Sequence, residues 1–109
     1  MTVKDAKEIL NGKILTCENQ IDRSISGVYA CDLLSWAMAN VKEDNLWITI
    51  QTNLNIVAVA SLTDASVIVI PEGLELEEII TKTAEEKDVM IMVTDMSAFE
   101  ICKALGQHI

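Results

Sequence analysis

Two uninterrupted apolar runs limit this chain to a small set of folds. Ser66–Ile70 and Val89–Val93 are built almost entirely from Val, Ile and Met, and Leu46–Ile50 is a third run of this kind. A strand that is apolar at nearly every position has both faces covered, which is typical of a parallel sheet between layers of helices. Apolar residues at helical spacing separate the runs, in Leu54–Leu62 and Leu76–Thr83. This alternation predicts a three-layer α/β/α fold with a mainly parallel sheet and right-handed crossovers.

Helix caps predict further elements at both ends of the chain. Thr2 with Asp5, and Ser97 with Glu100, have the spacing of capping boxes, and Gly106 predicts the end of the last helix. The remaining predicted elements are strands at Lys13–Thr16 and Ser26–Ala30 and a helix at Leu33–Asn40 capped by Asp32. No repeat or linker interrupts the sequence, so residues 1–109 are expected to form a single domain.

The charge and hydropathy of the chain disfavour two classes of partner. It has 17 acidic and 8 basic residues, a net charge of −9, and such a surface repels the phosphates of nucleic acids. The apolar runs are too short to span a membrane, and Met1–Asp5 lacks the features of a signal peptide. We therefore expect a cytoplasmic protein that binds neither nucleic acid nor membrane.

Residue types that carry catalysis are sparse. Cys17, Cys31 and Cys102 form no C-x-x-C pair and fit no zinc module, so buried thiols in a reducing compartment are the expected interpretation. The only histidine, His108, lies one residue from the end. The four glycines are scattered, whereas phosphate-binding loops need them clustered before a helix. We expect no catalytic residue, no metal, no cofactor and no enzymatic activity.

Polar side chains follow two of the predicted strands. Gln51, Thr52 and Asn53 come directly after Leu46–Ile50, and Asp95 follows the last strand. Because the carboxyl ends of parallel strands share one edge of a sheet, these side chains could form a shallow ligand-binding pocket. Each of them is also an ordinary turn-forming residue, so a plain connection is the alternative.

The helix predicted at Leu33–Asn40 is apolar on more than one side. Leu33, Leu34, Ala37 and Met38 face one way, whereas Trp36 points elsewhere. The helix around Val57 has almost no polar face. A helix of this kind is buried on two sides, either by its own domain or by a second subunit. The sequence predicts a homodimer with Leu33, Trp36 and Val57 in the interface.

The order of four segments resembles the DRTGG domain family. These segments are Tyr29–Ser35, Met38–Asn40, Leu46–Thr52 and Thr94–Glu100, and the resemblance extends over essentially the whole chain. It implies a fold like the N-terminal domain of HPr kinase/phosphorylase. Relatives of this kind also occur in phosphotransacetylases and, together with CBS domains, in regulated pyrophosphatases.

The residues that name this family are missing. Asp-Arg is expected near Thr52-Asn53 and Thr-Gly-Gly near Pro71–Gly73, where only Gly73 is retained. Asp22-Arg23 comes before the central strands, so we interpret it as unrelated to the motif. Without the arginine, a bidentate contact to a phosphate is lost, which weakens the expectation of an anionic ligand.

The resemblance implies a non-catalytic regulatory or assembly module that acts through protein–protein contacts. Stand-alone relatives often accompany iron-hydrogenase components, so a redox enzyme or a kinase is an expected partner beside a second copy of the chain. The alternative is a sensor for a small ligand, an adenine nucleotide or a metabolite, at Gln51, Thr52, Asn53 and Asp95.

Overall fold

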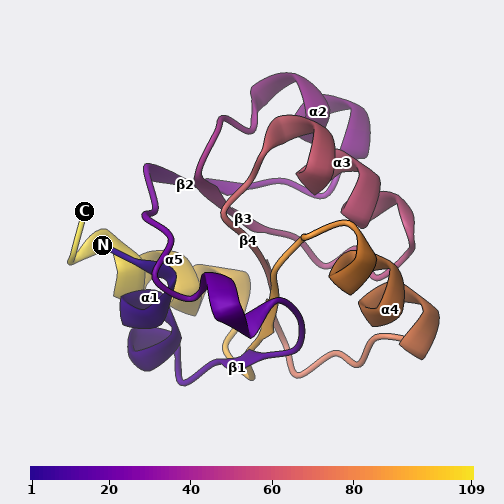
Figure 1. The fold of residues 1–109 in the computed structure, drawn as a ribbon. Coiled ribbons are helices and arrows are strands. Elements are labelled where there is room, and N and C mark those ends of the chain that lie inside the picture. The colour runs from indigo at the N-terminus through magenta and orange to yellow at the C-terminus, as the bar shows by residue number, and fades with distance from the viewer.

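The computed structural model describes all of residues 1–109. They form one five-stranded sheet flanked by helices (Figure 1). The sheet order is β1-β5-β4-β3-β2, and the three-layer prediction is confirmed. The strands are β1 (Lys13–Ile14), β2 (Gly27–Ala30), β3 (Asn45–Ile48), β4 (Val67–Ile70) and β5 (Ile91–Val93). The helices are α1 (Val3–Leu10), α2 (Leu34–Asn40), α3 (Asn55–Thr63), α4 (Glu78–Glu86) and α5 (Ala98–Gly106), with a 3₁₀ turn η1 (Glu18–Gln20).

Strands β2 to β5 are parallel and lie in the sheet in the same order as in the chain. β1 alone is antiparallel, and it pairs with β5 so that Ile14 lies opposite Met92. The hydroxyl of Thr16 strengthens this junction, because it donates to the carbonyl of Val89 at 2.7 Å and accepts from the amide of Ile91 at 2.9 Å. The N-terminal part of the chain therefore forms one edge of the sheet.

Each face of the sheet has its own apolar core. Helices α2, α3 and α4 cover one face and α1 and α5 cover the other (Figure 1). Within β3, Trp47 packs in the first core whereas Leu46 and Ile48 pack in the second, because alternate side chains of a strand point to opposite faces. Burial on both faces explains the uninterrupted apolar runs. None of the helices has both the length and the apolar character that crossing a bilayer requires.

Capping boxes determine where the first and last helices, α1 and α5, begin, but one other predicted cap is wrong. Both capping boxes form, at Thr2 and at Ser97. Asp32 does not cap α2: its carboxylate instead accepts from the hydroxyl of Thr49 at 3.0 Å and the amide of Ile50 at 2.8 Å. Gly106 is the last residue of α5 and not a stop beyond it. Sequence spacing alone could not reveal that the segment after β3 competes for the Asp32 side chain.

Arg23 connects three segments at the edge where the parallel strands begin. Its guanidinium forms ion pairs with Asp44 at 2.8 Å and Asp64 at 2.9 Å, and donates to the carbonyl of Asp64 at 2.8 Å. Asp44 and Asp64 both have left-handed backbones, so Arg23 also fixes two tight turns. Burial lowers the pKa of Arg23, but its bonds to the two carboxylates outweigh that effect and raise the pKa.

We expect Arg23→Met to destabilise the fold by about 1–3 kcal/mol, because the two turns lose charge-assisted hydrogen bonds while the apolar stem is kept. Urea unfolding followed by circular dichroism measures this change. Lys82→Met is the matched control, since Lys82 is exposed and forms no ion pair. Equal free energies of unfolding for the two variants would contradict a stabilising role for Arg23.

Candidate functional site

The loop after β3 is held by its own hydrogen bonds. The side-chain amide of Gln51 donates to the carbonyl of Asp32 at 3.0 Å and its oxygen accepts from Asn53 at 2.9 Å. The other end of the Asn53 side chain accepts from the amide of Asn55 at 2.9 Å, in the first turn of α3. Only Thr52 makes no side-chain hydrogen bond. Most of the polar capacity of this loop is therefore used to join β2, β3 and α3.

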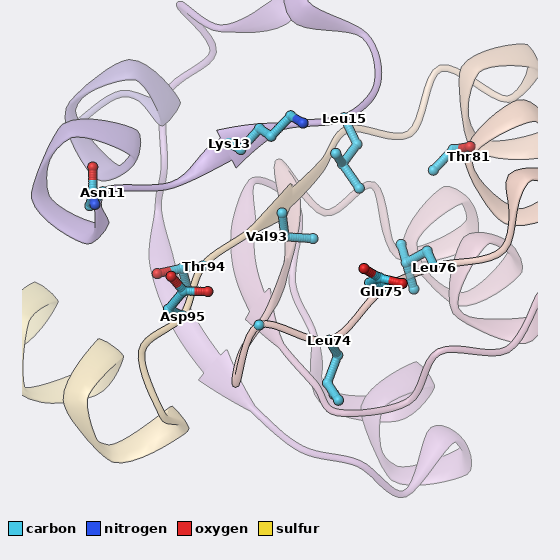
Figure 2. A pocket seen from close by; sticks show the side chains of 11 residues that line it. Asn11, Lys13, Leu15, Leu74, Glu75, Leu76, Thr81, Val93, Thr94 and Asp95 are labelled. Atoms are coloured by element: carbon cyan, nitrogen blue, oxygen red, sulfur yellow. The ribbon is translucent and has the colours of Figure 1, made fainter.

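Asp95 lies elsewhere, on the wall of a cavity of about 520 Å³ (Figure 2). Gln51, Thr52 and Asn53 do not line this cavity, so the four predicted site residues do not converge on one space. The cavity is lined by Asn11, Lys13, Leu15, Gly73, Leu74, Glu75, Leu76, Thr81, Val93, Thr94 and Asp95. It lies over β1 and the carboxyl end of β5, beside the segment that leads to α4.

Gly73 allows the walls of this cavity to approach each other. Its φ is +64°, and a Cβ atom there would lie 2.9 Å from the carboxylate of Asp95. The amide of Gly73 donates to the carbonyl of Thr94, and the amide of Glu72 donates to that of Met96, both at 2.9 Å. A side chain at position 73 would have to displace the Asp95 carboxylate and adopt a left-handed backbone, so this junction favours glycine.

The charged groups around the cavity have no partners within the chain. Lys13, Glu75 and Asp95 all line it, yet the two ion pairs of the structure both belong to Arg23. Asn11 ends α1 with a left-handed backbone, and its side-chain amide also forms no hydrogen bond. Figure 2 shows Lys13 and Leu15 on one side of Val93 and Glu75 and Leu76 on the other.

Asn11, Lys13 and Leu15 line the cavity although no sequence pattern predicted them there. Lys13 and Leu15 are two positions apart, so their side chains lie on the same face of an extended segment, and this spacing was the available signal. It identifies a site only once β1 is known to pair with β5, about 80 positions away in the chain. No local pattern encodes that pairing.

The surface of α2 carries exposed apolar side chains. Leu33 is 65% exposed and Trp36 is 57% exposed, with the indole nitrogen of Trp36 donating to the hydroxyl of Tyr29 at 2.8 Å. Ile50 is also exposed, and its backbone amide donates to the carboxylate of Asp32, which brings Ile50 beside Leu33. We call Leu33, Trp36 and Ile50 the α2 surface.

Val57 does not belong to this surface. It is only 2% exposed, because α3 buries it against the first core. Its side chain is already covered by the domain. Of the three residues predicted for an interface, only Leu33 and Trp36 are therefore exposed to solvent and available to a partner.

The cysteines do not form a reactive centre. Cys17 is buried, Cys31 is partly buried and Cys102 is exposed, so the prediction of buried thiols holds for Cys17 and is wrong for Cys102. Burial, aided by the carboxylate of Glu85, raises the pKa of the Cys17 thiol to about 11. A neutral thiol is a poor nucleophile. No cluster of three His, Cys, Asp or Glu residues is placed to hold a metal ion.

The raised pKa of Cys17 predicts a loss of stability at alkaline pH. The thiol ionises near pH 8.5 in the unfolded chain but only near 11 in the folded one. Its contribution is therefore complete below about pH 8.5 and falls as the pH rises towards 11. We expect the wild type to lose more stability between about pH 8 and 10.5 than Cys17→Ala, measured by urea unfolding. Parallel losses in both proteins would contradict the assignment.

Comparison with known proteins identifies the fold family. A model of the DRTGG domain matches residues 5–108, nearly the entire chain. The chain belongs to the DRTGG domain family. The predicted family is thereby confirmed, although the Asp-Arg and Thr-Gly-Gly residues are absent at the positions expected for them. Gly73, the retained residue of the second motif, is the glycine that the junction with Asp95 favours.

A solved structure shares this DRTGG fold. It is the CBS and DRTGG domains of the regulatory region of Clostridium perfringens pyrophosphatase, complexed with the activator diadenosine tetraphosphate. The TM-score is 0.75 at 14% sequence identity, and the match covers 97% of this chain and 46% of that one. The present chain thus spans about half the length of the chain it matches. A search of curated proteins finds no match.

Asp22 and Arg23 are the only Asp-Arg pair in this DRTGG domain, and they lie far from the cavity edge of the sheet. Arg23 is committed to Asp44 and Asp64 where β3 and β4 begin. The cavity lies instead where β4 and β5 end. Arg23 therefore stabilises turns, in agreement with the interpretation that this pair is unrelated to the family motif.

Proposed function

We propose that this DRTGG domain is a non-catalytic regulatory or assembly module that forms a homodimer through the α2 surface. The observation that carries the proposal is the exposure of Leu33, the residue just before α2, and of Trp36 in the first turn of that helix, together with Ile50 in the neighbouring loop. Apolar side chains gathered at one place on a soluble domain are typical of protein contact sites, and an exposed Trp is a frequent anchor of such contacts.

The chemistry around the α2 surface fits contact between two copies. A homodimer with two-fold symmetry places the same patch on both subunits, so an apolar patch meets its own copy without charge repulsion. Asp32, Gln51 and Asn53 lie beside the patch and supply the polar rim that surrounds such interfaces. The Trp36–Tyr29 hydrogen bond holds the indole in one orientation, which reduces the entropy lost on association.

The rest of the surface supports a second kind of contact. The net charge of −9 favours a partner with a basic face, approached by electrostatic attraction. The family resemblance points to a redox enzyme, such as an iron-hydrogenase component, or to a kinase as this partner. The similarity to the regulatory region of a pyrophosphatase supports a regulatory role in place of a catalytic one.

Size-exclusion chromatography with light scattering tests the proposal. At micromolar concentration and physiological salt we expect the mass of two chains, falling towards one chain on dilution. A monomer throughout the micromolar range would remove the homodimer. Affinity purification of the native protein then tests for the second partner, and mass spectrometry identifies it.

The second candidate function is a sensor for a small ligand. The cavity beside Asp95 supports it, as its volume is in the range of small-molecule sites. The related pyrophosphatase region binds a nucleotide activator, which makes adenine nucleotides a natural first panel together with common metabolites.

A thermal-shift screen tests the sensor. A ligand at ten times its Kd should raise Tm by about 5 °C or more for a domain of this size. Because Asn53 is hydrogen-bonded within its own loop, we expect Asp95→Asn to abolish the shift and Asn53→Ala to preserve it. The absence of a shift across the panel would remove the sensor function.

A further inference from the structure

The cavity beside Asp95 exists because helices do not cover the whole sheet. α4 begins only at Glu78, and the segment before it crosses the carboxyl end of β5 without forming a helix. Leu15, Leu76 and Val93 pack against the same core as α4 but are only partly buried. They form an apolar floor at the edge of that core, and Figure 2 shows the polar side chains arranged around it.

Groups of opposite charge stand around this floor without pairing. Lys13 comes from β1, Glu75 from the segment before α4 and Asp95 from the loop after β5. None of them forms an ion pair within the chain, although all line one cavity of about 520 Å³. The cavity therefore separates a cation from two carboxylates and leaves each open to an outside partner.

We propose that this cavity binds a small zwitterion of the amino-acid class, with an ammonium, a carboxylate and a short apolar body. Asp95 accepts hydrogen bonds from the ammonium. Lys13 donates to the carboxylate, and the apolar body packs against the floor. The inference rests on the sensor function and specifies its ligand.

The charges of the cavity favour this class over the alternatives. With one lysine against two carboxylates, and no arginine, the lining repels a nucleotide polyphosphate, and the net charge of −9 adds to that repulsion. A simple cation would leave Lys13 without a partner. A zwitterion satisfies both signs, and each charge-assisted hydrogen bond in such a site is about twice as strong as a neutral one.

NMR titration of the ¹⁵N-labelled protein with the twenty standard L-amino acids, followed by ATP, tests the proposal. We expect at least one amino acid to shift the amides of Asn11, Gly73 and Asp95. For that amino acid, the analogues lacking the carboxylate or the ammonium should each bind at least about tenfold more weakly.

Asp95→Asn and Lys13→Met should weaken binding to a similar extent. Glu72→Gln is the matched control, since Glu72 is in the same loop as Gly73 but does not line the cavity, and it should bind as the wild type does.

The outcomes separate this inference from the sensor function. Shifts at the cavity with ATP or a charged analogue, but with no amino acid, would overturn the zwitterion and leave the sensor in place. No shift with any probe would overturn both. Amino-acid binding that Asp95→Asn and Lys13→Met leave unchanged would also overturn the proposal, because it would lie outside this cavity.

Discussion

Leu33→Glu is expected to convert the homodimer into a monomer at micromolar concentration. In a two-fold interface the substitution places two like charges close together and removes two apolar side chains. An increase in the dimer Kd of about a hundredfold or more follows from these combined effects. The fold itself should be unaffected, since Leu33 is largely exposed and precedes the first turn of α2, where an acidic side chain is favourable.

Phe99→Glu is the matched control for this experiment. Phe99 is as exposed as Leu33, but it lies on α5, on the opposite face of the sheet. Sedimentation equilibrium of the two variants and the wild type measures the three dimer constants. A dimer that survives Leu33→Glu but not Phe99→Glu would move the interface to α5 and contradict the role of the α2 surface.

Replacement by alanine should cost much more stability at one tryptophan than at the other. Trp47 is fully buried, and its indole nitrogen donates to the carbonyl of Cys31 at 2.9 Å. Trp47→Ala leaves a large cavity in the first core and is expected to destabilise the domain by about 3–5 kcal/mol. Trp36→Ala removes a mostly exposed side chain and should change the free energy of unfolding by less than about 1 kcal/mol.

Urea unfolding in the Leu33→Glu background measures both changes without a contribution from association. If Trp47→Ala does not fold, Trp47→Phe replaces it and is expected to lose about 1–3 kcal/mol. A larger loss for Trp36→Ala than for Trp47→Phe would contradict the assignment of one tryptophan to the core and the other to the surface.

The sequence was sufficient to predict the elements whose determinants are local. β3, β4 and β5 follow from apolar runs, and α1 and α5 from capping boxes, because these signals act within a few residues. Asp32 was assigned wrongly because its carboxylate bonds to Thr49 and Ile50 of a neighbouring segment. Such competition between local and tertiary partners leaves no trace in residue spacing.

The candidate site was predicted less well for the same physical reason. Asp95 was placed at the correct edge of the sheet, but Gln51 is hydrogen-bonded to Asp32 and Asn53, and Asn53 also to Asn55. Lys13 enters the cavity only through the pairing of β1 with β5. Val57 was assigned to an interface because a helix buried by its own domain has the same apolar composition as a helix buried by a partner.

The pairing of β1 with β5 also determines when the cavity can exist. β2 to β5 are neighbours in the sheet in chain order, whereas β1 pairs only with β5, the last strand to be made. Until then Lys13 and Asp95 belong to separate, unconnected parts of the nascent polypeptide. A loop of about 80 residues must close to join them, which makes this a late and entropically demanding step. Competence to bind a ligand would therefore report that synthesis has passed β5 and that both ends of the fold have met.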